Sequence, residues 1–193
     1  MRNKSEIDTR KRIVEAAILI AAQSGFTKTT TKEIAKKAKS SEGIIYHYFK
    51  SKHELFLATI KESAEEFLGE LQTQINTGSD AKMQLESLVN FHFKYFTGKR
   101  HIFQILFGKS GDAMVPFSHV LKTVILPYQK VVAGIIEKGI KSGDFQQVNV
   151  VIAASSILGM MQFNIIKLHF GVGSASIEET KDTVKKLIFR VLL

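Results

Sequence analysis

The chain has 193 residues, of which 45% are hydrophobic and 23% are charged, values typical of a folded soluble protein. It contains no cysteine, which excludes disulfides and thiolate chemistry and fits a reducing compartment. The charged N-terminus lacks the apolar segment of a secretory signal peptide, so we expect a cytoplasmic protein.

The longest uncharged run, residues 145–166, is close to the length of a membrane span. Seven polar residues interrupt it: Gln146, Gln147, Asn149, Ser155, Ser156, Gln162 and Asn164. These interruptions favour a helix that is buried on most sides over a transmembrane helix. We therefore expect no membrane partner.

The net charge of +9 is concentrated at the N-terminus. Residues 1–55 hold twelve basic and six acidic side chains, whereas residues 56–193 hold fifteen and twelve. A polyanionic partner for the N-terminal part is one explanation of this imbalance. A solvated basic surface without such a partner explains the charge alone equally well.

Apolar periodicity and capping signals predict an all-α protein of about nine helices, and no segment shows convincing strand alternation. The first helix spans residues 9–24 and ends at Gly25. Capping boxes, Thr30 with Glu33 and Ser51 with Glu54, open the second and fourth helices. The N-terminal helices are predicted over residues 9–24, 31–38, 42–49 and 52–74.

Beyond residue 80, every predicted element is again a helix. Pro127 interrupts one of these helices and predicts a kink or a break near Leu126. A further capping box, Ser176 with Glu179, opens the last helix. The predicted helices of this part cover residues 81–97, 101–107, 117–142, 148–170 and 176–193.

Residues 30–49 combine two short predicted helices with a tight connection at Lys39-Ser40-Ser41. The second of these helices ends in a cluster of aromatic residues and a histidine. This is the organisation of a helix-turn-helix, in which the second helix enters the major groove of DNA.

Residues 9–60 resemble the N-terminal domain of the TetR/AcrR family of bacterial transcriptional regulators. The residues that carry the resemblance are Ile13, Ala16-Ala17, Gly25-Phe26, Thr29-Thr30, Ile34-Ala35, Ala38, Gly43, Ile45-Tyr46-His47-Tyr48-Phe49, Ser51-Lys52 and Leu55. The resemblance implies a three-helix DNA-binding domain over residues 1–52 and a larger helical domain, for effector binding and dimerisation, over residues 53–193. Lys39 stands where the family usually has glycine, so we expect a positive φ there.

The resemblance places the recognition helix at residues 42–48. Ile44 and Ile45 are adjacent and face different ways, so we expect Ile45 and Phe49 in the core and Ile44 in the groove. The hydroxyl of Tyr48 and the ring of His47 are suited to phosphate oxygens. The predicted DNA contacts are Thr29, Thr30, Thr31, Ser41, Glu42, Gly43, Ile44, Tyr46, His47, Tyr48 and Lys52.

In this family the helical body usually encloses an effector cavity, so polar and aromatic side chains on its apolar faces are candidate ligand contacts. The alternative for each of them is an ordinary place in a dense core. The candidates are His92, Tyr95, Phe96, Phe103, Tyr128, Met161 and Gln162. No histidine pair has the spacing of metal ligands, and we expect neither a metal nor another cofactor.

Taken together, these features predict a homodimeric transcriptional repressor. The resemblance implies dimerisation through the last two helices, a palindromic double-stranded DNA operator and release by a small hydrophobic effector. A basic helical carrier or interaction protein with only non-specific DNA affinity is the alternative. An enzyme is not expected, because no nucleophile–base pair or carboxylate pair has a suggestive spacing.

Overall fold

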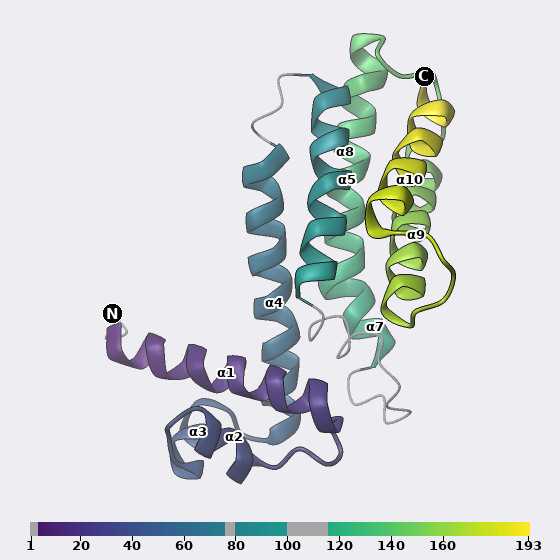
Figure 1. The fold of residues 1–193 in the computed structure, drawn as a ribbon. Helices are drawn as coiled ribbons and strands as arrows, with labels where there is room; N and C mark the ends of the chain where they lie inside the picture. Colours follow the sequence, from purple (N-terminus) through teal and green to yellow (C-terminus); the bar gives the residue numbers. More distant parts are fainter. Residues whose placement is uncertain (1–3, 76–79, 100–115) are drawn as a thin grey trace. The chain divides into compact units, whose positions relative to one another are not determined.

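The computed structural model describes residues 4–75, 80–99 and 116–193. Every regular element within these ranges is a helix, which confirms the predicted all-α class (Figure 1). The elements are α1 (Lys4–Ser24), α2 (Thr31–Lys37), α3 (Glu42–Tyr48), α4 (Lys52–Ile75), α5 (Ala81–Gly98), α7 (Phe117–Val120), the π-helical segment η1 (Leu121–Ile125), α8 (Leu126–Ser142), α9 (Val150–His169) and α10 (Ile177–Leu192).

The described chain divides into two compact units. One contains residues 4–65 and 116–124, and the other contains residues 66–75, 80–99 and 125–193. α4 therefore contributes its first part to one unit and its last part to the other. The domain boundary expected after residue 52 stays a prediction.

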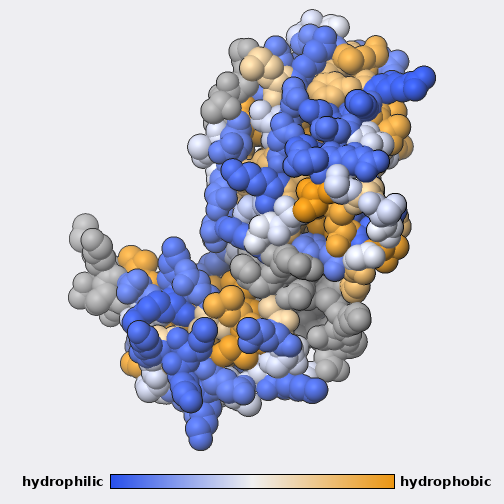
Figure 2. All heavy atoms as spheres, in the orientation of Figure 1, coloured by the Kyte–Doolittle hydropathy of each residue, from blue (hydrophilic) through white to orange (hydrophobic). Residues whose placement is uncertain are grey.

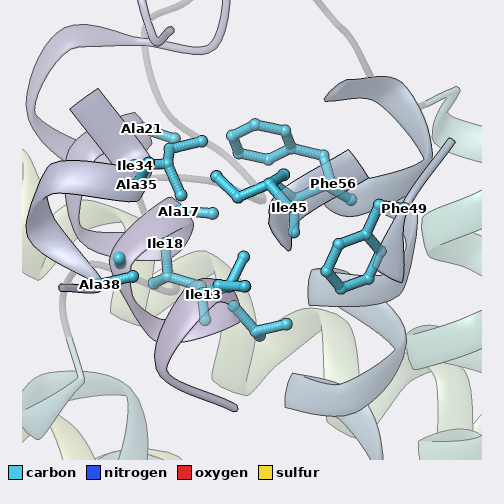
Figure 3. Close-up of a cluster of buried hydrophobic side chains, with 13 residues drawn as sticks. Ile13, Ala17, Ile18, Ala21, Ile34, Ala35, Ala38, Ile45, Phe49 and Phe56 are labelled. Atoms are coloured by element: carbon cyan, nitrogen blue, oxygen red, sulfur yellow. The ribbon is translucent and has the colours of Figure 1, made fainter. Parts of the chain in front are cut away.

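The core of the N-terminal unit is a cluster of small and branched apolar side chains at the crossing of α1, α2 and α3 with the start of α4 (Figure 3). Alanines on α1 and α2 let these two helices approach closely, and the larger side chain of Phe56 from α4 packs into the same cluster. The cluster comprises Ile13, Val14, Ala16, Ala17, Ile18, Ala21, Ile34, Ala35, Ala38, Ile45, Phe49, Leu55 and Phe56.

The second unit is a bundle in which α8 packs on α9, α5 packs on both, and α10 packs on α5 and α9. Its core includes five fully buried side chains, Leu85, Leu88, Val132, Ile136 and Ile165. These residues recur at helical spacings, so each helix turns one apolar stripe inward.

Two predicted segments differ from the structure. Residues 117–142 form α7, η1 and α8 in place of one α-helix; the interruption predicted near Leu126 is confirmed, because Pro127 has no N–H to bond the preceding turn and a π-helical segment precedes α8. The first helix begins at Lys4, five residues before the predicted start. The helix and loop predicted over residues 101–107 and 109–115 lie outside the described residues.

The expectation that the uncharged run forms a helix buried on most sides is wrong for a single copy of the chain. Only 28% of the apolar window of α9 is buried, because one face of the helix packs on α5, α8 and α10 while the described residues leave the other face largely uncovered. Among the described residues, α9 is the one helix long and apolar enough to cross a membrane.

The turn between α8 and α9 depends on a glycine. A Cβ placed on Gly139 would lie 2.1 Å from Cδ2 of the Phe145 ring, and the Phe145 N–H donates to Gly139 O at 3.0 Å. Because Gly139 has no side chain, the ring of Phe145 packs directly against the backbone of α8 and is only 4% exposed.

Replacing Gly139 with alanine is expected to lower the free energy of unfolding by about 1–3 kcal/mol, because the added methyl group overpacks the site. Gly134 lies on the same helix and has open space around it. Gly134→Ala should therefore raise stability by about 0.5–1 kcal/mol through helix propensity. Urea denaturation followed by circular dichroism measures both changes, and an equal effect of the two would contradict the packing argument.

Candidate DNA-binding helix and effector site

The orientation of α3 is set by two buried anchors. Ile45 is 1% exposed and Phe49 is 2% exposed, which confirms both as core residues. Ser41 caps the helix, and its Oγ accepts a hydrogen bond from the Ile44 N–H at 3.3 Å. With these anchors in place, Ile44 at 40% exposure and Tyr46 at 51% exposure point away from the core.

The two helices of the motif are joined by side chains that were predicted to touch DNA. Thr31 Oγ1 donates to Glu42 Oε2 at 2.6 Å, which links the start of α2 to the start of α3. Thr30 and Glu33 form the predicted capping box at the start of α2. The hydrogen bonds from Thr30 hold the pKa of the Glu33 carboxyl below its usual value. The visible surface over α2 and α3 is largely hydrophilic (Figure 2).

The turn between α2 and α3 confirms the expectation for Lys39. Its φ is +52°, the only positive value at a non-glycine residue among those that the structure describes. The strain is small enough to be held by the turn's own backbone bonds, since the Ser40 N–H donates to Ala35 O at 2.9 Å. The connection is therefore tight even without the glycine.

Thr29 and Lys52 have partners within the protein. Thr29 is fully buried, and its hydroxyl donates to Gly25 O at 2.7 Å. The Lys52 ammonium donates to Phe26 O at 3.0 Å and Thr29 O at 2.6 Å, and it lies 4.0 Å from the centre of the Phe26 ring. Burial lowers the pKa of Lys52, and Glu33 partly opposes this shift. These contacts support a structural role, and DNA contact by either residue stays a prediction.

Replacing Lys52 with methionine separates the two roles. If Lys52 mainly holds the segment between α1 and α2, Lys52→Met should lower the free energy of unfolding by about 1–3 kcal/mol, since charge-assisted hydrogen bonds are lost. The dependence of DNA affinity on salt should then stay the same. A loss of about one unit in the salt slope with unchanged stability would instead show a phosphate contact.

The remaining predicted DNA contacts differ in exposure. Exposed side chains or backbone occur at Thr30, Ser41, Glu42, Gly43, Ile44, Tyr46 and His47, whereas Thr31 and Tyr48 are half-buried. Arg10 was not among the predicted site residues. Its guanidinium pairs with Glu62 and lies 5.0 Å from the centre of the Phe49 ring. Its position in the N-terminal half of a long helix gave no signal for these tertiary contacts.

In the second unit, three of the predicted effector contacts gather around one ring, and a fourth, His92, packs on two of them. Phe67 of α4 lies 4.9 Å from both Tyr95 and Tyr128 and 5.4 Å from Phe96, measured between ring centres. His92 lies 4.8 Å from Phe96 and stacks on Tyr128 at 5.9 Å. Phe67 was not among the predicted effector contacts, so its central place is a finding of the structure.

His92 is a buried imidazole with one satisfied nitrogen. It is 1% exposed, and Nδ1 lies 3.2 Å from the Tyr128 hydroxyl, while Nε2 has no hydrogen-bond partner among the described residues. Burial lowers the pKa of His92 to about 3, so the ring is neutral near pH 7 and offers one donor and one acceptor nitrogen. Burial also raises the pKa of the Tyr128 hydroxyl, which stays protonated.

Two more of the predicted effector contacts carry buried polar atoms that find no hydrogen-bond partner in the described part of the chain, the Tyr95 hydroxyl and Nε2 of Gln162. Met161 is fully buried beside Gln162 on α9, which packs on α5. An unpartnered buried polar atom is costly, so three of them on one pair of packed helices mark a place where a ligand can supply hydrogen bonds. Phe103, the remaining candidate, lies outside the described residues.

Metal binding finds no support in the part of the chain that the structure describes, where no group of three or more histidine, aspartate or glutamate side chains converges. The buried polar atoms are a neutral imidazole, an amide and a phenol, which favour hydrogen bonding to a ligand carbonyl or hydroxyl. These groups would complement an apolar ligand that carries a few polar atoms.

Both parts of the chain match known family models. Residues 13–59 match the model described as bacterial regulatory proteins, tetR family, and residues 78–192 match the model described as tetracyclin repressor-like, C-terminal domain. The fatty acid metabolism regulator protein of Bacillus subtilis strain 168 is 25% identical over 148 residues, covering 76% of each chain.

Solved structures resemble the whole chain. The fatty acid degradation regulator FadR from Bacillus halodurans aligns with a TM-score of 0.83 at 20% identity, covering 98% of this chain and 96% of its own. The transcriptional regulator FadR from Bacillus subtilis in complex with stearoyl-CoA aligns with a TM-score of 0.82 at 22% identity, covering 94% and 98%. At these identities the likeness shows the fold.

Proposed function

The chain belongs to the TetR family of bacterial regulatory proteins and is a DNA-binding transcriptional regulator, and from this premise we propose that it is a homodimeric repressor released by a long-chain acyl thioester. The observation that carries the DNA-binding part is the orientation of α3. Ile45 and Phe49 anchor the helix while Ile44, Tyr46 and His47 are exposed along it. A helix held in this way can present its side chains to a major groove.

Dimerisation through α9 and α10 is supported by apolar side chains that a single copy leaves exposed. Val151, Ile152 and Phe163 of α9 are 66%, 62% and 62% exposed, and Leu187 and Val191 of α10 are 47% and 57% exposed. Hydrophobic residues are visible along the side of the molecule where α9 and α10 lie (Figure 2). A second copy related by a two-fold axis would cover this surface and pair two recognition helices.

The proposed effector has an apolar chain and a carbonyl group. The aromatic side chains around Phe67 supply an apolar environment, and the unpartnered amide nitrogen of Gln162 offers a hydrogen bond to an acceptor. Nε2 of His92 offers a second one in the tautomer in which Nδ1 accepts from the Tyr128 hydroxyl. A related structure holds stearoyl-CoA, a molecule of this chemistry. The effector acts by binding more tightly to a conformation of the dimer that fits the operator poorly, so its differential affinity sets the response.

Binding to the DNA immediately upstream of the gene tests the repressor part of the proposal. An inverted repeat from that region should bind at least about 100-fold more tightly than a scrambled fragment, and the affinity should fall steeply with salt. Equal affinity for the two fragments would support the basic carrier instead. The proposal places the protein in the cytoplasm and includes no catalytic step.

Replacing His47 with alanine should weaken binding to operator and scrambled DNA by a similar factor of about 3–10, because a phosphate contact carries no sequence information. The side chain is exposed, and among the described residues it contacts the Tyr48 ring, at 5.2 Å between ring centres, so stability should not change. Fluorescence anisotropy with both fragments measures the effect. A loss confined to the operator would show that His47 reads a base.

A further inference from the structure

A cavity of the second unit opens on the side formed by the end of α4 and the length of α5. Its volume is about 450 Å³. The α5 residues that line it, among them Ser87, Asn90, Lys94 and Gly98, recur at spacings of three and four and therefore form one continuous face of the helix. We call this cavity the α4–α5 pocket. Gly98 is exposed at its end and has no side chain to fill it, since a Cβ built on Gly98 meets nothing within 4 Å.

The pocket combines three kinds of group. Phe91 is half-buried and offers part of its ring as a flat apolar wall. Ser87 and Asn90 supply hydroxyl and amide groups that both donate and accept hydrogen bonds. Lys94 is exposed at the pocket, and no ion pair involving it occurs within the described ranges. A ligand that has a planar ring with polar edges and an attached anionic group would complement these three kinds of group.

The opposite wall of the pocket contains Lys99 and Glu70, which belong to a cluster of ion pairs. The Lys99 ammonium bonds Glu66 at 2.9 Å and Glu70 at 3.1 Å, which ties the end of α5 to α4. Partial burial lowers the pKa of Lys99, but these two bonds outweigh it and raise the pKa above its usual value. The lysine therefore keeps its charge and offsets much of the repulsion that Glu70 would exert on an anion.

Behind this cluster lies a polar atom without a partner. Tyr95 lines the pocket and is 5% exposed, and the Lys99 ammonium covers its ring at 4.5 Å from the centre. Its buried hydroxyl has no hydrogen-bond partner among the described residues. Burial raises the pKa of Tyr95 to about 12 although the neighbouring Lys99 opposes the shift, so the hydroxyl is protonated.

We propose that the α4–α5 pocket binds a nucleotide, with the base against Phe91, its polar edge toward Asn90 and Ser87, and its phosphate on Lys94. Tyr95 is shared with the effector contacts discussed above, and the other residues that line this site lie outside them. The same chemistry has two sources, a free nucleotide or the adenosine phosphate part of an acyl-CoA. Only the second source rests on the proposed function.

Calorimetric titration of the whole protein with adenosine 3′,5′-bisphosphate tests the site. Gly98→Leu fills the pocket without changing a charge, and Gly69→Leu is the matched control, since Gly69 is an exposed α4 glycine with open space around it and does not line the pocket. We expect the nucleotide to bind the wild type and Gly69→Leu alike, and Gly98→Leu at least about tenfold more weakly. Lys94→Gln should weaken binding about three- to tenfold.

Three results would overturn the site: no binding of the nucleotide to the wild type, equal binding to Gly98→Leu, or inorganic phosphate binding as tightly as the nucleotide. All variants should keep their operator affinity, so this test can fail while the proposed function stands. Release of the operator by stearoyl-CoA distinguishes the sources. A higher concentration required by Gly98→Leu identifies the coenzyme A part as the ligand, and an unchanged concentration identifies a free nucleotide.

Discussion

Replacing Ile45 with alanine should lower the free energy of unfolding of the N-terminal domain by about 2–5 kcal/mol and abolish operator binding near 37 °C. Ile45 is 1% exposed and is the buried residue of α3, a helix of seven residues. Truncation removes buried apolar surface and leaves a cavity that α1 and α2 cannot close without losing their own contacts. A helix this short has no independent stability, so α3 loses its orientation when its anchor is lost.

The neighbouring isoleucine supplies the control. Ile44→Ala removes the same atoms from a side chain that is 40% exposed, so stability should change by no more than about 0.5 kcal/mol. Its effect should instead appear as altered preference among operator sequences, because an apolar side chain in the groove can contact a thymine methyl group. Urea denaturation and anisotropy on the two variants separate these effects. Equal stability losses would contradict the orientation of α3.

Replacing Gln162 with methionine should leave stability unchanged or raise it by about 1 kcal/mol while weakening the effector response at least about tenfold. The Gln162 amide nitrogen is buried without a partner, so its removal relieves a desolvation cost in the free protein. If the amide bonds the effector carbonyl, the same change removes a buried hydrogen bond from the complex. Gain of stability with loss of response is the expected sign of a binding residue.

Asn164 lies on the same helix and provides a partnered comparison, since its amide donates to Met160 O at 2.8 Å. Asn164→Leu should cost about 1 kcal/mol at most and leave the effector response intact. Thermal unfolding and titration of the DNA complex with stearoyl-CoA measure both variants. A response of Gln162→Met equal to that of the wild type would remove Gln162 from the proposed site.

Local chemistry explains why the sequence predicted the DNA-binding motif well. The Thr30–Glu33 capping box, the positive φ of Lys39 and the opposite faces of Ile44 and Ile45 all depend on residues within a few positions of one another. Helical periodicity and capping act at that range. The expected boundaries of α2 and α3 therefore agree with the structure to within one or two residues.

Features that depend on tertiary placement were not predictable in the same way. Lys52 bonds carbonyls more than twenty residues earlier in the chain, and no local pattern encodes that contact. The free face of α9 has the same apolar composition as a buried face, so composition could not reveal that it lacks a partner in one copy. The central ring of Phe67 likewise required the packing of α4 against α5 and α8 to be known.

Titration of the complex between the protein and its upstream operator with stearoyl-CoA, followed by the anisotropy of labelled DNA, is the most direct test of the central claim. The proposed mechanism predicts that the DNA is released as the ligand is added, that coenzyme A without an acyl chain does not release it, and that Gln162→Met requires at least about tenfold more ligand. Operator binding that is unchanged or strengthened by the acyl thioester would contradict the claim.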